Sequence, residues 1–285
     1  MAQDETGREL GRHERYRGEY PIIVEGLKTA FGPQVVHQDL DLKVRRGEIL
    51  GVVGGSGTGK SVLMRAIIGL QRPTEGEVSV FGRSIAGSDP QREIGIRSRW
   101  GVLFQGGALF SSMTVGENVM LPLFEHTKLD RKTMEIMTRM KLQVVELGGF
   151  ENLMPSELSG GMIKRAAFAR AIVMDPKILF CDEPSAGLDP VVASQLDDLI
   201  LLLRDALGMT VVVVTHELES AFKIADRITV LDRGEILFIG TPDELRASDN
   251  QRIQNLLNRV AEDDTMDAET YLNRLTGDEP AYRPL

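Results

Sequence analysis

The sequence predicts an α/β fold in which helices cover a mostly parallel sheet and a helical subdomain is inserted into the sheet domain. From Pro21 to about Gly240, apolar runs rich in Val and Ile alternate with helical patterns, which is typical of parallel strands joined by helices. Between Ser111 and Glu157 the pattern is Met-rich and helical, without strong strand signals. The expected divisions are a flexible arm at 1–20, a sheet domain at 21–245 with a helical subdomain at about 111–170, and a C-terminal extension at 246–285.

Composition narrows the class of protein. The 285 residues have room for one large domain or two small ones. The formal net charge of −9 argues against a nucleic-acid partner, because binding to a phosphate backbone depends on clustered Lys and Arg. No run approaches the roughly 20 apolar residues of a membrane-spanning helix, and no apolar segment near the N-terminus resembles a secretory signal. The single cysteine, Cys181, excludes an internal disulfide and fits a reducing cytoplasm.

Three apolar runs are the expected buried strands: Glu48–Gly54, Lys177–Glu183 and Met209–His216. Each leads into turn chemistry or a helix. Ligands of such sheets bind beyond the carboxyl ends of the strands. The residues that follow these runs are therefore the candidate site residues.

The first run ends in a phosphate-binding loop. The segment "GGSGTGKS" fits G-x-x-x-x-G-K-[ST] and lies between a strand signal and the helical signal "VLMRAIIGL". Its residues are Gly54, Gly55, Ser56, Gly57, Thr58, Gly59, Lys60 and Ser61. The glycines let the backbone wrap around phosphates, Lys60 reaches the β- and γ-phosphates, and Ser61 can ligate Mg²⁺. The alternative is a flexible glycine turn, which does not explain Lys-Ser at a helix start.

Polar residues that end other strands supply the remaining candidates. Asp182 and Glu183 end a buried strand directly before Pro184, where Asp182 suits Mg²⁺ and Glu183 can polarise a water. The alternative is a helix cap or a solvated acidic pair. His216 is either a γ-phosphate contact or a structural histidine. Gln105, which ends "GVLFQ", carries little information by itself.

A second anion-binding pattern lies about a hundred residues later. In "SELSGGMIKRAAFARA", small residues run into an amphipathic stretch that contains Lys164, Arg165 and Arg170. Backbone N–H groups at a helix start and the helix dipole both favour negative charge. One chain therefore carries two phosphate-binding patterns.

Together these segments resemble the ATP-binding-cassette (ABC) ATPases over Ile22 to about Leu245. The matching motifs are Walker A (Gly54–Ser61), the Q-loop glutamine (Gln105), the signature "LSGGM" (Leu158–Met162), Walker B (Ile178–Asp182) followed by Glu183, the D-loop "SAGLD" (Ser185–Asp189) and the switch histidine (His216). The resemblance implies a P-loop NTPase of the ABC type, with a mixed or parallel RecA-like sheet core. It further implies ATP hydrolysis, with Glu183, His216 and Gln105 as catalytic residues.

The resemblance also implies why two phosphate-binding patterns occur. In ABC ATPases two copies pair head to tail, and the signature of one copy covers the ATP held by Walker A of the other. Ser159, Gly160, Gly161 and Met162 are thus expected to act in trans. Asp189 is expected to join the two sites across the interface. Ser61, Gln105 and Asp182 are the implied Mg²⁺ ligands.

Two positions depart from the family pattern. Met162 replaces the usual final Gln of the signature, which removes a polar side chain and leaves the preceding backbone donors in place. Phe31, in "TAFGPQ", stands where the adenine-stacking residue is usually Tyr. It keeps the stacking face without the hydroxyl, or it is an ordinary edge-strand aromatic.

Within the ABC ATPases, two segments resemble the cassette subunit of Mla-type (MCE-associated) transporters: "FQGGALFSSMTVGENVMLPLFEHTKL" (Phe104–Leu129) and "LSGGMIKRAAFARAI". The resemblance implies phospholipid transport between the inner and outer membranes, powered from the cytoplasmic face of the bacterial inner membrane. The implied partners are a second copy of the chain, an MlaE-like permease dimer, a periplasmic MCE-domain ring and a STAS-domain MlaB-like protein.

Other functions stay open. An ABC ATPase of a solute importer and a division-type cassette without transport both fit the motifs. The tail presents Ile253, Leu256, Leu257 and Val260 on one helix face. This face either grips the neighbouring protomer or folds onto its own domain.

Overall fold

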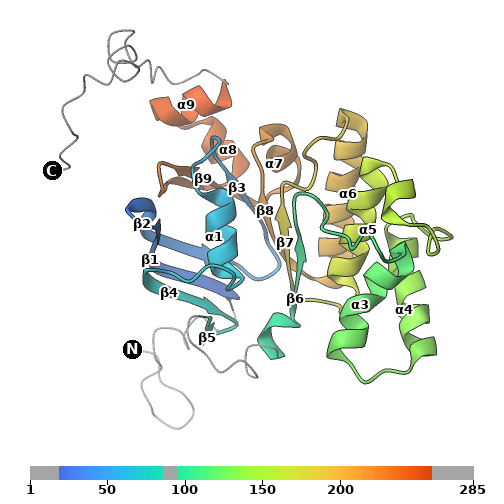
Figure 1. The fold of residues 1–285 in the computed structure, drawn as a ribbon. Helices are drawn as coiled ribbons and strands as arrows, with labels where there is room; N and C mark the ends of the chain where they lie inside the picture. The colour runs from blue at the N-terminus through green and yellow to red at the C-terminus, as the bar shows by residue number, and fades with distance from the viewer. Residues whose placement is uncertain (1–18, 86–94, 259–285) are drawn as a thin grey trace, which may run out of the picture. The chain divides into compact units, whose positions relative to one another are not determined.

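The computed structural model describes residues 19–85 and 95–258 (Figure 1). Its strands are β1 (Ile22–Phe31), β2 (Gln34–Val44), β3 (Ile49–Val53), β4 (Glu75–Val80), β5 (Arg83–Ser84), β6 (Trp100–Leu103), β7 (Ile178–Asp182), β8 (Thr210–Val214), β9 (Arg227–Asp232) and β10 (Glu235–Gly240). Its helices are α1 (Lys60–Ile67), α3 (Val115–His126), α4 (Arg131–Val144), α5 (Gly160–Ile172), α6 (Pro190–Leu207), α7 (Leu218–Ile224), α8 (Pro242–Arg246) and α9 (Gln251–Leu257). The chain divides into two compact units, 1–247 and 248–285.

A six-stranded sheet forms the centre of the first unit, in the order β10-β9-β3-β8-β7-β6. Strand β3 pairs in parallel with β8 and β9, and β7 pairs in parallel with β6 and β8. Only β10, at one edge, runs antiparallel to its neighbour. The three predicted buried runs are β3, β7 and β8, so the predicted α/β class with a mostly parallel sheet is confirmed.

Both faces of this sheet are buried, which explains why its strands read as continuous apolar runs. Alternate side chains enter opposite layers because successive residues of a strand point to opposite faces. Phe180 and Val212 belong to one cluster with α1, whereas Cys181 and Val213 belong to the other, with α5 and α6. The carboxyl ends of β3, β7 and β8 therefore meet at one edge, between two rigid layers.

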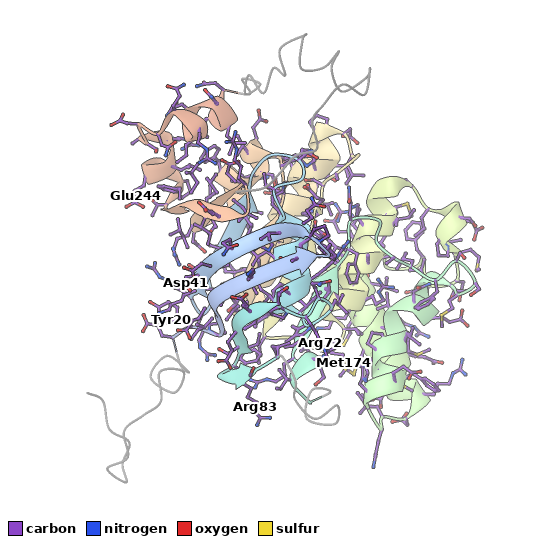
Figure 2. The ribbon with its side chains drawn as sticks, turned by 60° about the vertical axis from the view of Figure 1, so that its left-hand side comes forward. Tyr20, Asp41, Arg72, Arg83, Met174 and Glu244 are labelled. Carbon is purple, nitrogen blue, oxygen red and sulfur yellow. The ribbon has the colours of Figure 1, made fainter. Side chains whose placement is uncertain are left out.

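The sequence pattern did not predict a second sheet, which is antiparallel and has the order β2-β1-β4-β5. Helix α1 contacts β1 and β4 of this sheet and β7 and β8 of the central sheet. Figure 2 brings the antiparallel sheet forward, with Tyr20 and Asp41 on the side away from α3, α4 and α5. The pairing of β1 with β4 joins residues about fifty positions apart, so the local hydrophobic pattern of the sequence cannot predict it.

Helices α3, α4 and α5 fall in the interval where the sequence predicts a helical subdomain. Thr114 and Glu117 form a capping box at the start of α3, and the side chain of Asp130 accepts a bond from Thr133 N at 3.1 Å to begin α4. Buried Asn118 fixes the loop before α3, because its amide accepts from Phe110 N at 2.7 Å and donates to Phe110 O at 3.0 Å. The loop after Gln105 is thereby anchored to the helices.

The second unit contains helix α9 (Gln251–Leu257). Asn250 caps its N-terminus, because the Asn250 side chain accepts a hydrogen bond from Arg252 N at 2.9 Å. Ile253, Leu256 and Leu257 lie on this helix, and Val260 of the predicted apolar face lies outside the described residues.

Close packing of β6 against α5 supplies the first testable prediction. A Cβ added at Gly101 would lie 2.0 Å from Ala171 O. Gly101→Ala is expected to lower the free energy of unfolding by about 1–3 kcal/mol, because backbone must move to admit the methyl group. Urea denaturation measures this change. Gly95→Ala, whose Cβ would meet nothing within 4 Å, is the matched control, and equal stability of the two variants would contradict the prediction.

Candidate functional site

The loop between β3 and α1 has a backbone that only glycine fits at two positions. Gly54 and Gly59 have φ angles of 156° and 97°. A Cβ at Gly54 would lie 2.1 Å from Leu231 O, and a Cβ at Gly59 would lie 2.5 Å from Nε2 of His37. The loop is therefore held tightly against β9 and β2, and it leads directly into the N-terminus of α1. A helix N-terminus preceded by such a loop is suited to bind phosphate.

Lys60 lies at the base of this loop and is only 8% exposed. Its Nζ donates to Gly54 O at 2.9 Å and to Gly55 O at 2.7 Å. Burial lowers the pKa of Lys60, and the negative charges of Glu183 and Asp182 oppose this shift. The loop carbonyls hold the ammonium inside the curve of the loop, where the phosphates of a nucleotide would lie.

Ser61 and Asp182 come from different elements and meet below the loop. Ser61 Oγ donates to Asp182 Oδ1 at 3.0 Å, joining the first turn of α1 to the end of β7. Burial raises the pKa of Asp182, while the Ser61 hydrogen bond acts in the opposite direction. A hydroxyl and one carboxylate are hard oxygen donors that fit Mg²⁺, which takes few protein ligands beside substrate phosphates. Among the described residues no group of three or more His, Cys, Asp or Glu side chains forms a separate metal site.

Glu183 follows Asp182 with a φ of 48°, in the left-handed region that costs a non-glycine residue about 1–3 kcal/mol. Its Oε2 lies 2.8 Å from Nδ1 of His216 and accepts from His216 N and Thr215 Oγ1, each at 3.3 Å. The carboxylate from the end of β7 is thus fixed by the residues after β8. Thr215 was not among the predicted site residues, and only its position directly before His216 in the sequence indicates that it could contact Glu183.

These groups surround a pocket of about 590 Å³. It is lined by Val36, Ser56, Gly57, Thr58, Gly59, Lys60, Ser61, Val62, Gln105, Glu183 and His216. Gln105, from the end of β6, and His216, from the end of β8, therefore share one space with the phosphate loop. Phe31 is not among the lining residues and is 49% exposed at the end of β1. The apolar contact from the antiparallel sheet is Val36, which the sequence analysis missed.

The signature segment does not reach this pocket. Ser159 begins α5, and its Oγ accepts from Met162 N at 3.3 Å. Ser159 and Gly160 are exposed, and the side chain of Met162 packs against the apolar core beneath the helix. Asp189 accepts from Val191 N and Val192 N, each at 3.1 Å, so within one chain it caps α6.

The basic residues of α5 bond to groups of their own chain. Arg165 pairs with Glu146 Oε2 at 2.9 Å. Arg170 donates to Gly107 O at 2.7 Å and to Ala108 O at 2.6 Å. Lys164 is 5% exposed and bonds to backbone carbonyls. The charges of these residues are used in the packing of α5, whereas the start of the helix, at Ser159 and Gly160, is exposed.

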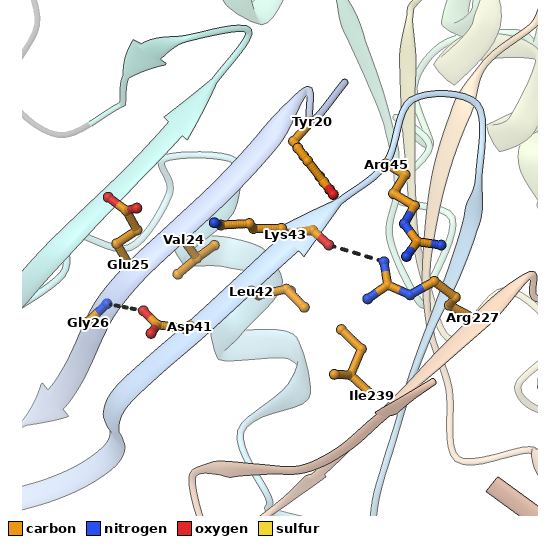
Figure 3. Close-up of a pocket in the computed structure, with 10 residues that line it drawn as sticks. All are labelled: Tyr20, Val24, Glu25, Gly26, Asp41, Leu42, Lys43, Arg45, Arg227 and Ile239. Atoms are coloured by element: carbon orange, nitrogen blue, oxygen red, sulfur yellow. Dashed lines mark hydrogen bonds between the residues drawn. The ribbon is translucent and has the colours of Figure 1, made fainter. Parts of the chain in front are cut away.

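A second pocket, of about 640 Å³, lies against β1 and β2 (Figure 3). It contains Lys43, Arg45 and Arg227 together with Glu25 and Asp41. Arg227 donates to Lys43 O at 3.4 Å and also pairs with Glu48. None of the motif residues lines this larger pocket, and its charges are mixed. The chemistry therefore favours the smaller pocket as the nucleotide site.

A phosphate loop between a strand and a helix, with a carboxylate at the end of another parallel strand, defines a P-loop NTPase. A family model described as ABC transporter matches residues 37–186. The chain belongs to this family, and it is an ABC ATPase cassette.

Two curated relatives are 40% identical to the chain. One is the probable ribonucleotide transport ATP-binding protein mkl of Mycobacterium leprae (strain TN), matched over 237 residues, 83% of this chain and 68% of that protein. The other is the intermembrane phospholipid transport system ATP-binding protein MlaF of Escherichia coli (strain K12), matched over 231 residues, 81% of this chain and 86% of that protein. The chain thus spans about two thirds of the mycobacterial relative and most of the other.

A solved structure with the same fold is the dimeric, post-hydrolysis state of the ATP-binding cassette MJ0796 bound to ADP and Pi. The TM-score is 0.71 and the identity 30%, over 78% of this chain and 98% of that one. Within residues 19–85 and 95–258, no helix combines the length and apolar character needed to cross a membrane.

Proposed function

We propose that two copies of this chain bind ATP head to tail, so that each nucleotide lies between the phosphate loop of one copy and the signature of the other. One observation carries the proposal: the pocket at Lys60 has no lining residue from the signature, whereas Ser159 and Gly160 are exposed on the same chain. Each chain then offers two incomplete half-sites, and only a pair of chains completes them. ABC cassettes dimerise, and the related MJ0796 cassette was solved as a dimer.

Each residue of the pocket has a role in this scheme. Lys60 binds the β- and γ-phosphates, and Glu183 accepts a proton from the attacking water. His216, whose ring nitrogen lies 2.8 Å from the Glu183 carboxylate, contacts the γ-phosphate and orients that carboxylate. Ser61, Gln105 and Asp182 would hold Mg²⁺, which supplies positive charge against the phosphate oxygens. Hydrolysis removes the phosphate that both copies contact, and the dimer then opens.

The trans arrangement predicts that Ser159→Arg abolishes ATP-driven dimerisation and leaves each monomer folded. An arginine at the exposed start of α5 places a long side chain where the partner's nucleotide must approach, and this bulk keeps the two copies apart. ATP turnover should fall by about 100-fold, comparable to the loss of one electrostatic contact to the transition state. Size-exclusion chromatography with ATP and a coupled ATPase assay measure both effects.

Asn152→Arg is the matched control, because Asn152 is exposed and lies in the same group of helices. It should dimerise and turn over ATP at the normal rate. Normal turnover by Ser159→Arg would contradict the trans arrangement.

We also propose that this ATPase powers phospholipid transport between the inner and outer membranes. The name of the MlaF relative states this function for that protein, and the sequence segments after Gln105 and around the signature resemble Mla-type cassettes. The name of the mkl relative points instead to ribonucleotide transport. A solute importer and a division-type cassette are therefore the competing assignments.

A groove beside the Q-loop supports a membrane permease as the partner. It has a volume of about 530 Å³, and its lining includes Trp100, Phe104, Ala108, Phe110 and Pro122. Phe110 is 52% exposed, and the loop that carries it is fixed by Asn118 and Arg170. Arg97, His126 and Arg170 also line this recess between sheet and helices, which suits a short helix of an MlaE-like permease dimer that carries both apolar and polar side chains. The chain would then lie on the cytoplasmic face of the inner membrane, with a periplasmic MCE-domain ring and a STAS-domain MlaB-like protein in the same assembly.

Co-purification of the tagged full chain from native membranes distinguishes these assignments. Recovery of an MlaE-like permease with MCE-domain and STAS-domain proteins supports phospholipid transport. Recovery of a solute-binding protein with its permease would contradict phospholipid transport and support a solute importer. Recovery of a division permease would contradict it and support a division-type cassette. Phe110→Asp, which places a charge in the groove, should reduce recovery of the permease, whereas Leu202→Asp, at an exposed position on α6, should not.

A further inference from the structure

Lys164 is a buried cation between two motifs of the ATP site. It lies on α5, five residues after Ser159, and is 5% exposed. Its Nζ donates to the backbone carbonyl of Glu183 at 3.2 Å and to the backbone carbonyl of Gln105. The ammonium thus joins the signature helix to the ends of β7 and β6. A charged donor makes stronger hydrogen bonds than a neutral one, particularly in a buried site.

The two carbonyls belong to residues whose orientation matters for hydrolysis. Glu183 has a φ of 48°, which its surroundings must enforce. Its N–H donates to Val214 O at 2.8 Å on one side, and Lys164 binds its C=O on the other. The backbone of Glu183 is therefore held on both sides of its Cα, and with it the direction in which the carboxylate points.

Gln105 is held in a similar way. Lys164 binds its carbonyl, and two residues further on Arg170 of the same helix donates to Gly107 O and Ala108 O. Helix α5 consequently binds the Q-loop at three backbone carbonyls, those of Gln105, Gly107 and Ala108. A movement of α5 would pull on the backbone of Gln105 and of Glu183 at once.

We infer that Lys164 is a positioning residue for ATP hydrolysis, which sets the backbone orientation of Glu183 and Gln105 from the signature helix. The inference rests on the proposed roles of those two residues. Lys164 does not line the nucleotide pocket, so it acts through its neighbours and leaves nucleotide binding to the phosphate loop. A signature helix drawn toward the partner's ATP would thereby adjust the catalytic groups of its own chain.

Lys164→Met, which removes the donors and retains most of the side-chain volume, tests the inference. It should lower kcat for ATP by about 10- to 100-fold, the equivalent of losing hydrogen bonds from a charged group, with KM for ATP within twofold of the wild-type value. Lys164→Arg, which keeps a charged donor able to reach both carbonyls, should recover most of the activity. Lys141→Met is the matched control: Lys141 lies on α4 and pairs with Asp175 at the surface, and its loss should leave kcat and KM unchanged.

Further measurements separate positioning from simple support of the fold. In a Glu183→Gln background, Lys164→Met should lower the residual single-turnover rate by a smaller factor than in the wild-type background, because the part of its effect that passes through Glu183 is already lost. A kcat within twofold of wild type for folded Lys164→Met would overturn the inference, as would equal losses in kcat for the Met and Arg variants. If Lys164→Met does not fold, Lys164→Gln replaces it in the experiment. It should likewise lower kcat and leave KM for ATP within twofold of the wild-type value. Normal turnover by Glu183→Gln alone would instead overturn the proposed function.

Discussion

Glu183→Gln is expected to preserve ATP binding and to lower ATP turnover by about 100- to 10,000-fold, the usual contribution of a general base. The amide is nearly isosteric with the carboxylate and can still bond to His216 and Thr215, so the pocket keeps its shape. It cannot accept the proton of the attacking water. The bound ATP should therefore persist and hold two copies together, and size-exclusion chromatography with ATP and Mg²⁺ should show a stable dimer.

Glu219→Gln provides the control for this experiment. Glu219 is an exposed carboxylate in the first turn of α7, three residues after His216. Its neutralisation should change neither turnover nor the oligomeric state. If Glu183→Gln hydrolysed ATP at the wild-type rate, Glu183 would not be the base, and another acceptor would have to be sought around the pocket.

Lys60→Ala should reduce turnover by about 100- to 1,000-fold, which corresponds to the ~2.7–4 kcal/mol lost with one preorganised electrostatic contact. Unlike Glu183→Gln, it should also weaken ATP binding, because Lys60 contacts phosphates in the ground state as well as in the transition state. The ATP-dependent dimer should then fail to form. Fluorescent-nucleotide titration and a coupled ATPase assay separate the two effects.

The control for Lys60→Ala is Lys132→Ala, since Lys132 is exposed in the first turn of α4. Its loss removes the same charge and leaves the pocket untouched. ATP affinity within twofold of wild type in Lys60→Ala would contradict the assignment of the loop as the phosphate site. The opposite dimerisation behaviour of the Lys60 and Glu183 variants distinguishes failure to bind ATP from failure to hydrolyse it.

The carbonyl contacts of α5 connect the two half-sites that we propose for each chain. Its N-terminus carries the signature, which is proposed to meet the partner's nucleotide, and its buried face holds the backbone at Gln105 and Glu183 through Lys164. The same helix fixes the loop that bears Phe110 through Arg170. One rigid helix therefore links the nucleotide pocket, the dimer surface and the groove proposed for the permease.

Features that depend on short stretches of chain could be predicted from the residues alone. The strand, glycine loop and helix around Lys60 are contiguous, and the positive φ angles of Gly54, Gly57 and Gly59 favour glycine at those positions. The acids that end β7 and the histidine that ends β8 could be placed together, because parallel strands of one sheet present their carboxyl ends at one edge. The α/β class followed from the same apolar runs.

Features that join distant parts of the chain became visible in the folded protein. The antiparallel sheet brings Val36 to the pocket. Lys164 of α5 donates to backbone carbonyls 59 and 19 positions away in the sequence. Hydrophobic periodicity reports which face of an element is buried, and it carries no information on which distant backbone group a buried cation will find there. That partner is fixed by the packing of α5 against the ends of β6 and β7.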